Sequence, residues 1–247
     1  ALNFTSASNA QLDTTPVPLV NSANGGTAKA LRILPIGDSI TAGSPRQPSY
    51  RRVLWNLMVG DPALRRVDLV GSRNGVNLNG GTCASPVGLP PDSEGRPVLA
   101  EFDQDHDAYW GWCTDLVRQR LALVLPNVQP DVALVHLGTN DLGGKPSAQI
   151  ATEFGMLVAG LRARNPDIRV LIAQLIPFSG DNAARVDLNQ RIASLAQSLS
   201  TASSPVLAVD QDSGFVAATD TYDGLHPNDA GEVKMADRWL QALRSFW

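Results

Sequence analysis

Residues 31–43 have the sequence LRILPIGDSITAG, in which a short apolar run is followed at once by a glycine and polar residues. The run at residues 31–36 has the length and composition of a buried β-strand. Gly37 allows the backbone to turn sharply, so that Ser39 would project at the carboxyl end of the strand. This stretch therefore predicts a strand that leads directly into a loop with a reactive hydroxyl.

Strand and helix patterns alternate along the rest of the chain. Apolar runs predict four further strands, and longer segments with helical apolar spacing predict five helices; the strands lie at residues 67–70, 132–137, 170–175 and 206–209, and the helices at 49–59, 114–125, 147–164, 182–199 and 228–246. Such alternation predicts a doubly wound, flavodoxin-like α/β/α sandwich of three layers with a central five-stranded parallel sheet. Functional residues should then follow the carboxyl ends of the strands.

Two segments depart from this alternation. Residues 1–30 are rich in small and polar residues and show no sustained period, which predicts an irregular N-terminal extension. Residues 71–112 form a long connection rich in Gly, Pro, Asn and Asp. Structureless loops of that length are usually functional, so the second segment is expected to contribute to the site.

The composition excludes several classes of protein. Apolar residues make up 43% and charged residues 18% of the 247 residues, as in a globular domain. The formal net charge is −4, and the short pairs Arg51-Arg52 and Arg65-Arg66 are interpreted as solvated faces. Nucleic acid is therefore not expected as a partner. No apolar run reaches the length of a membrane span, so a membrane is not expected as a partner. The chain is also expected to be a monomer.

The N-terminus and the cysteines indicate the cellular compartment in which the protein is found. The sequence begins at Ala1 without a charged and apolar leader, which we interpret as a secreted, mature chain, and Asn3 begins an Asn-Phe-Thr glycosylation sequon. Cys83 and Cys113 are the only cysteines. They could be two free thiols of a reduced cell, but the other two features favour an extracellular disulfide. No zinc-like Cys/His spacing occurs, so no metal is expected.

The loop after the first strand carries the first candidate residue. Ser39 is a possible nucleophile. Alternatively, the loop could cradle a phosphate, but the GxxxxGK[ST] pattern is absent and Asp38 would repel an anion. A third interpretation is that Asp38 or Ser39 caps a helix. The four-residue pattern alone does not decide among these alternatives.

Two further polar motifs stand where the sheet would place a site. Asn140 follows the third long apolar strand and offers an amide N–H donor, although Asn and Asp are also common turn residues. Asp223 and His226 stand three residues apart before the last helix, where the carboxylate could orient the imidazole. An isolated pair of this kind would more often be a capping Asp and a surface His. Together with Ser39, however, these residues supply a nucleophile, a base, its orienting group and an oxyanion donor.

These motifs, taken in order along the chain, resemble those of the SGNH (GDSL) hydrolases. The resemblance implies Ser39 as nucleophile, His226 as general base and Asp223 as its partner. It also implies an oxyanion hole formed by the amides of Ser39 and Gly71 and the side chain of Asn140. Gly71 is matched because it follows the second predicted strand. The resemblance further implies a single SGNH hydrolase catalytic domain over residues 31–247 that needs no cofactor.

Three stretches, at residues 33–39, 70–73 and 106–112, resemble carbohydrate esterase family three, the acetylxylan esterases. The third departs from the His-Glu-Gly-Tyr-x-Gly-Trp form of that family. This resemblance implies a secreted serine esterase that removes acetyl groups from xylan or related glycans, so that the partner is an acetylated polysaccharide or a small ester. The alternatives are a GDSL lipase or thioesterase for longer acyl chains, and a non-catalytic glycan-binding module.

The aromatic residues of the long connection allow two interpretations. Tyr109, Trp110 and Trp112 could form a platform for a sugar ring, because flat apolar faces suit pyranose surfaces. They could equally form a hydrophobic cluster that fixes the loop beside Cys113. His106, in the same loop, could contact substrate or hold the loop in place. His136, by contrast, lies within an apolar strand and is predicted to be a hydrogen-bonded core residue.

Overall fold

The computed structural model describes residues 29–44, 47–62, 64, 66–75, 81–83, 101–180 and 183–246. The strands are β1 (Leu31–Gly37), β2 (Val67–Leu69), β3 (Arg73–Asn74), β4 (Asp105–Ala108), β5 (Val132–His136), β6 (Arg169–Ala173) and β7 (Val206–Val209). The α-helices are α1 (Ser39–Ala42), α2 (Tyr50–Val59), α3 (Thr114–Val124), α4 (Ser147–Arg162), α5 (Ala183–Leu199), α6 (Ala217–Asp220) and α7 (Asp229–Arg244), and η1 (Leu125–Asn127) is a 3-10 turn. The predicted sequon at Asn3 and nearly all of the predicted N-terminal extension lie outside the described residues.

The strands form one sheet in the order β3-β4-β1-β5-β6-β7, and β2 also pairs with β1. All pairs are parallel except β3 with β4. β2 pairs with the beginning of β1 at residues 31–33, whereas β4 pairs with its end at Ile36 and Gly37. The five predicted strands are therefore present, but β3 and β4 enlarge the sheet. The prediction missed them because β3 has two residues and β4 has the polar sequence DHDA.

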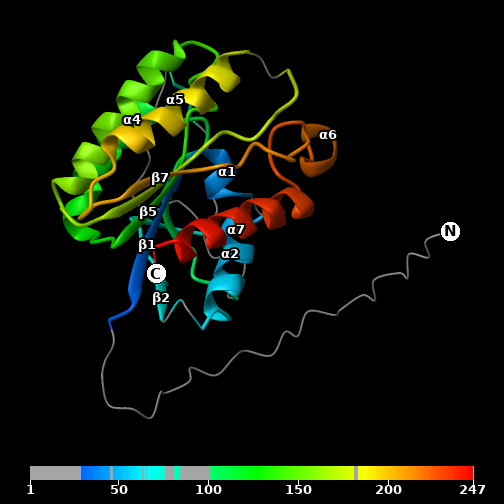
Figure 1. Cartoon of the computed structure of the whole chain (residues 1–247). Coiled ribbons are helices and arrows are strands. Elements are labelled where there is room, and N and C mark those ends of the chain that lie inside the picture. The colour runs from blue at the N-terminus through cyan, green and yellow to red at the C-terminus, as the bar shows by residue number, and fades with distance from the viewer. Residues whose placement is uncertain are drawn as a thin grey trace.

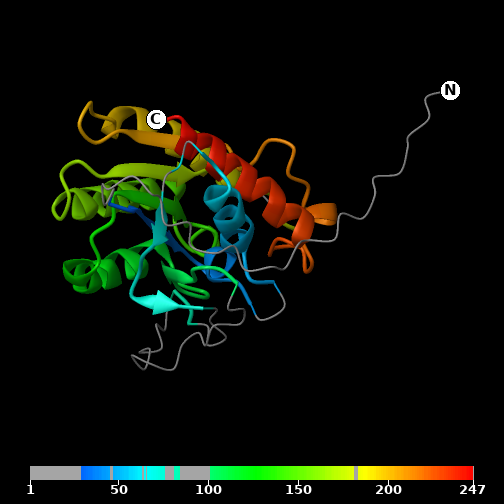
Figure 2. The same ribbon diagram turned by 90° about the horizontal axis from the view of Figure 1, so that it is seen from below.

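Helices cover both faces of the sheet, which confirms the predicted α/β sandwich. The helices α3, α4 and α5 lie on one face, and α2 and α7 lie on the other (Figures 1 and 2). Alternate residues of β5 divide between these two cores: Ala133 and Val135 pack toward α3–α5, and Val132 and Leu134 pack toward α2 and α7. A strand buried on both faces has the continuous apolar sequence seen here.

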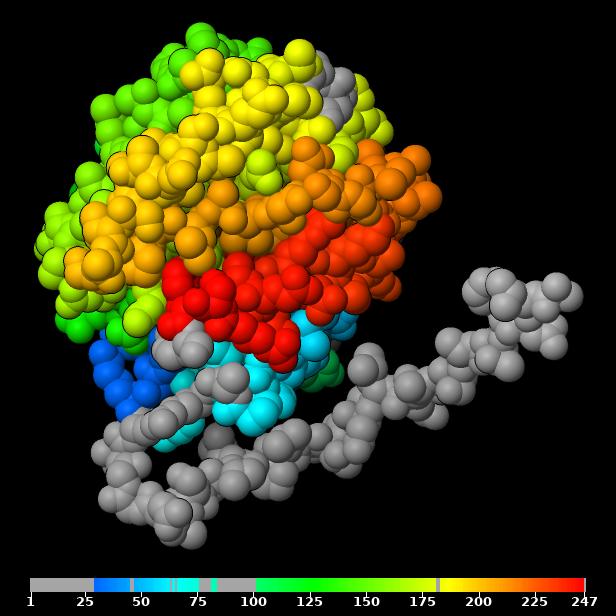
Figure 3. Space-filling view, in the orientation of Figure 1, coloured from blue at the N-terminus to red at the C-terminus, as the bar shows by residue number. Residues whose placement is uncertain are grey.

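The carboxyl edge of the sheet brings together segments that are far apart in sequence. β1 and β5 are neighbours whose last paired residues are Gly37 and His136. His226, just before α7, contacts Ser39, just after β1, so the N-terminus of α7 lies at the same edge. α6 packs against α7 (Figure 3). The loops after β1 and β5 and the segment before α7 therefore converge. In the part of the chain that the structure describes, no helix combines the length and apolarity needed to span a membrane.

Candidate active site

Ser39, His226 and Asp223 form a continuous chain of hydrogen bonds. Nε2 of His226 lies 2.8 Å from Oγ of Ser39, and Nδ1 lies 2.7 Å from Oδ2 of Asp223. With its proton on Nδ1, the ring donates to the carboxylate and Nε2 accepts from the serine hydroxyl. The other carboxylate oxygen accepts the backbone N–H groups of Leu225 and His226. Partial burial raises the pKa of Asp223, but these N–H groups and the imidazole outweigh that effect, so its pKa is below the ordinary value.

The turn between β1 and α1 places Ser39 in the first turn of a helix. A Cβ atom on Gly37 would lie 2.1 Å from Oγ1 of Thr41 and 2.8 Å from the carbonyl oxygen of His136, so glycine is required there. Asp38 caps the helix, because its Oδ1 accepts the N–H of Ile40 at 3.0 Å. Burial raises the pKa of Asp38 to about 7, although the Ile40 N–H lowers it. The predicted capping role therefore belongs to Asp38, which leaves the Ser39 hydroxyl free to contact His226.

Three N–H donors come from the ends of neighbouring strands. The backbone N–H of Ser39 begins α1, where helical N–H groups have no intrahelical acceptor. Gly71 follows β2, and a Cβ there would lie 2.2 Å from the carbonyl oxygen of His106, so only glycine fits. Nδ2 of Asn140, after β5, donates to the carbonyl oxygen of Trp112 at 3.0 Å. An amide has two N–H bonds, so this contact orients Asn140 and leaves its second N–H for a ligand.

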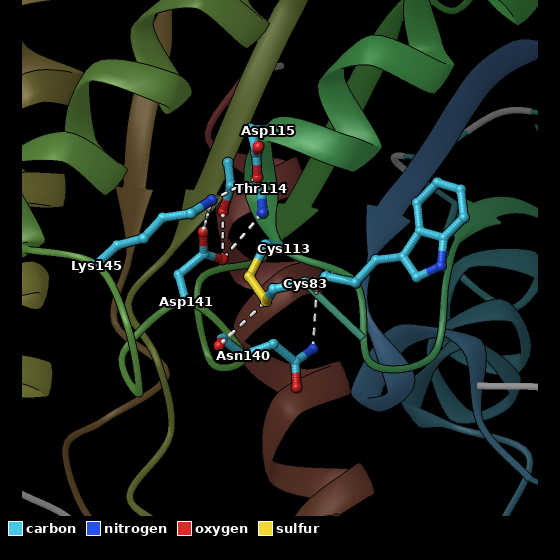
Figure 4. The surroundings of a disulfide bond; sticks show 8 residues. Cys83, Cys113, Thr114, Asp115, Asn140, Asp141 and Lys145 are labelled. Carbon is cyan, nitrogen blue, oxygen red and sulfur yellow. Dashed lines mark hydrogen bonds and ion pairs between the residues drawn. A yellow bond between two sulfur atoms is a disulfide. The ribbon is translucent and has the colours of Figure 1, made fainter. Parts of the chain in front are cut away.

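The residue after Asn140 anchors this loop to helix α3. Asp141 is almost fully buried, and its Oδ2 accepts the backbone N–H of Thr114 at 2.9 Å and the Thr114 hydroxyl at 3.0 Å (Figure 4). Lys145 donates to Oδ1 of Asp141 at 2.8 Å and also to Asp115. Because a buried carboxylate needs several donors, this network fixes the backbone that carries Asn140.

The disulfide Cys83–Cys113 is present beside the same loop, as predicted (Figure 4). Its Cα atoms are 5.0 Å apart, and Sγ of Cys83 lies 3.4 Å from the carbonyl oxygen of Asn140. Cys113, Asp115 and Asp141 also come together at metal-ligand spacing. The cysteine sulfur is already bonded, however, and the Lys145 ammonium bridges both carboxylates. This donor set therefore forms an ion-pair network and does not suit a metal ion.

The predicted aromatic platform divides into one residue at the site and two in the core. The Trp110 ring stacks on His226 with a centroid separation of 4.8 Å, and its indole N–H donates to the carbonyl oxygen of Gly43 at 2.8 Å. Tyr109 and Trp112 are buried and stack on each other at 4.5 Å. Their burial in the core favours the alternative interpretation, a hydrophobic cluster that fixes the loop beside Cys113.

The other two histidines are buried. Nδ1 of His106 accepts the backbone N–H of Ala108, and its Nε2 lies 3.0 Å from the carbonyl oxygen of Gly75, so the ring ties β3 to β4. His136 is a core residue as predicted, but neither ring nitrogen has a hydrogen-bond partner among the described residues. Burial lowers the pKa of His136 to about 4, and the ring is therefore neutral.

Sequence reasoning missed two residues of the site. Tyr222 stacks on His226 with a centroid separation of 5.8 Å, and Glu232 lines a small cavity beside Ser39. Tyr222 could have been noticed as the neighbour of Asp223. The only sequence feature that points to Glu232 is its charge, because it lies between buried positions of α7 where an apolar residue is expected.

Residues 36–233 match the GDSL-like Lipase/Acylhydrolase family. The chain belongs to this family. It is accordingly a carboxylic ester hydrolase, and the SGNH resemblance is confirmed.

Three of the proteins similar to this chain are esterases. A multidomain esterase of Ruminococcus flavefaciens is 27% identical over 93% of this chain, which spans only 30% of that relative's length. A carbohydrate esterase family 3 structure from Talaromyces cellulolyticus is 28% identical with a TM-score of 0.71, covering 88% of this chain and 99% of that one. An acetyl esterase mutant structure with acetate ion is 27% identical, also with a TM-score of 0.71, covering 87% and 99%. The family member described here is therefore similar to acetyl esterases of carbohydrate esterase family 3.

Proposed function

We propose that this chain is a secreted serine esterase that removes acetyl groups from carbohydrates, with O-acetylated xylan or a related glycan as substrate. The observation that carries the proposal is the hydrogen-bond chain from Ser39 through His226 to Asp223. The similarity to an acetyl esterase and to family 3 carbohydrate esterases supports the acetyl group and the carbohydrate. The disulfide supports an oxidising compartment.

The reaction proceeds by two acyl transfers. His226 takes the proton of Ser39 as Oγ attacks the ester carbonyl, and Asp223 holds the imidazole in the required orientation. The N–H groups of Ser39, Gly71 and Asn140 stabilise the negative oxygen of the tetrahedral intermediate. His226 then protonates the departing alcohol. In the second transfer, His226 takes a proton from water as the water oxygen attacks the acetyl-enzyme, and it returns this proton to Oγ of Ser39 as acetate leaves.

A substrate series tests this proposal. We expect acetate esters to be hydrolysed faster than butyrate, and butyrate faster than octanoate. A preference for octanoate would instead favour the GDSL lipase or thioesterase alternative, and binding to acetylated xylan without hydrolysis of any ester would favour a glycan-binding module.

The nucleophile is tested separately. Ser39→Ala should abolish hydrolysis while the melting temperature stays close to that of the wild type, because only the hydroxyl oxygen is removed. A serine-reactive phosphonate should label the wild-type chain at Ser39, as read by peptide mass spectrometry. Labelling at another residue, together with an active Ser39→Ala variant, would refute the mechanism.

A further inference from the structure

A small cavity adjoins the Ser39–His226 pair. Its volume is about 10 Å³, which is close to the minimum that holds one water-sized group. Eight of its lining residues carry a polar side chain: Ser39, Ser44, Gln47, Ser49, Trp110, Tyr222, His226 and Glu232. The cavity is therefore too small for a sugar ring and is suited to a single hydroxyl group.

Two buried oxygens of this wall lack a hydrogen-bond partner. Glu232 is 1% exposed, and within the described residues its Oε2 has no partner. Oε1 of Gln47 is likewise buried without a partner among those residues. Buried polar atoms in folded proteins are nearly always hydrogen-bonded. Both residues line one cavity, and rotation of the Gln47 amide exchanges its Oε1 for an N–H. Together they therefore indicate a ligand that donates one hydrogen bond to Glu232 and accepts another from Gln47.

The backbone around Ser49 fixes Glu232 in place. Ser49 has a φ of 79°, a value that L-residues rarely adopt, and its N–H donates to Oε1 of Glu232 at 3.0 Å. Strained conformations of this kind persist where the surrounding structure requires them, often at functional sites. Since Oε1 is held by this bond, Oε2 remains as the oxygen that is free to accept from a ligand.

The protonation state of Glu232 changes near neutral pH. Burial raises the pKa of its carboxyl group to about 7, whereas the nearby Arg52, the Ser49 N–H and Arg51 lower it and Asp229 raises it. Glu232 is therefore mostly ionised only above about pH 7, where a hydrogen bond to its carboxylate is stronger than one between neutral groups.

We propose that this cavity is a subsite for one hydroxyl group of the carbohydrate, on the alcohol side of the ester, with Glu232 as acceptor. Gln47 completes the site, because rotation of its amide presents an N–H to the hydroxyl oxygen. Because the cavity has the volume of one water-sized group, a sugar hydroxyl can take the place of a water molecule there and make the same hydrogen bonds. The proposal rests on the proposed acetyl esterase function and names residues that select a sugar over another alcohol.

The test compares two acetate esters, a xyloside monoacetate and an aryl acetate whose leaving group has no other hydroxyl. Glu232→Gln keeps an oxygen for the Ser49 N–H but replaces the free acceptor with a donor. We expect the ratio of kcat/KM for the sugar ester to kcat/KM for the aryl ester to fall about tenfold, as for the loss of one hydrogen bond to a charged group. Gln47→Ala should lower the ratio in the same direction and serves if Glu232→Gln does not fold.

Glu153→Gln is the matched control, because Glu153 pairs with Arg118 on the opposite face of the sheet from α7. That variant should leave the ratio unchanged. A wild-type ratio in folded Glu232→Gln and Gln47→Ala would overturn the subsite. An equal loss of kcat/KM for both esters would also overturn the subsite, because Glu232 would then act in the hydrolytic step or in folding. If the wild type hydrolyses neither ester, the proposed function fails and the subsite fails with it.

Discussion

Removal of the disulfide should lower the melting temperature of this protein with little effect on its catalytic rate. The perturbation is the double variant Cys83→Ala and Cys113→Ala, which breaks a bridge between residues 30 apart in sequence. In the chain-entropy model, a closed loop of that length stabilises the folded state by about 3.6 kcal/mol. For a domain of this size, that loss should lower the melting temperature by about 7–14 °C.

Activity should respond much less than stability. The bridge contacts the Asn140 loop, but Asp141 is held independently by Thr114 and Lys145. The Trp112 carbonyl also orients the Asn140 amide by a bond that does not involve sulfur. We therefore expect kcat on an aryl acetate, well below both melting temperatures, to fall by less than about tenfold, whereas loss of an oxyanion donor costs about 10²–10³.

Thermal unfolding followed by circular dichroism and initial rates at one low temperature are the two measurements. Wild-type protein treated with reductant is the control, and it should behave like the double variant. An unchanged melting temperature would refute the calculated stabilisation. A hundredfold loss of kcat in fully folded variant would show that the disulfide, and not the Asp141 network, positions Asn140.

Three further predictions concern single residues. Asn140→Ala should lower kcat about 10²-fold with little change in KM, because the donor acts in the transition state, and steady-state kinetics will check this; a normal kcat would make Asn140 only a turn residue. Trp110→Leu should lower kcat for aryl and xylan acetates alike, since Trp110 packs on His226; a loss confined to xylan would restore the platform interpretation. Asp38 has a folded pKa of about 7 against an ordinary 3.8, so the folded state binds more protons between these values and stability should fall as pH rises through that window. Asp38→Asn should flatten this part of the urea-unfolding profile, and an unchanged slope would contradict the assignment.

The polar residues that meet at the sheet edge could be predicted from the sequence because each lies next to a strong local signal. Ser39 follows an apolar run and a glycine, and Asn140 follows another apolar run. Parallel strands bring their carboxyl ends to one edge, so the two loops were expected to meet once the strands were recognised. Asp223 and His226 are close in sequence and precede a helix with a clear N-cap at Asn228. Local chemistry and topology together were sufficient here.

The aromatic residues of the long connection show where sequence information ends. Tyr109 and Trp112 have the side chains of a sugar platform, but the same side chains fill cores. Their burial depends on β4, which pairs with β1 through residues that have no strand-like apolar pattern. The stacking of Trp110 on His226 joins residues 116 positions apart (226 − 110). No local pattern of residue types determines which tryptophan faces the site.

The spacing of Arg51 relative to the apolar residues of α2 indicates its burial, but it was interpreted as solvated. The pair Arg51-Arg52 was predicted to be solvated, but Arg51 is fully buried. Its guanidinium donates to the carbonyl oxygens of Thr41, Ala42, Gly75 and Gln104. Arg51 also stands three and seven residues before Leu54 and Met58, the spacing of one helical face.

The physical reason for the burial of Arg51 lies in the shortness of α1. A helix of four residues cannot satisfy its own last carbonyl groups, and here a side chain from α2 supplies the donors. Burial lowers the pKa of Arg51 to about 10, so the guanidinium remains charged at neutral pH and suits a helix C-terminus. The same side chain joins α1 to the segments around β3 and β4. Arg51 of α2 therefore fixes α1, the helix that carries Ser39. The same guanidinium group also fixes Gly75 and Gln104 of the long connection, where sequence patterns predicted no strand.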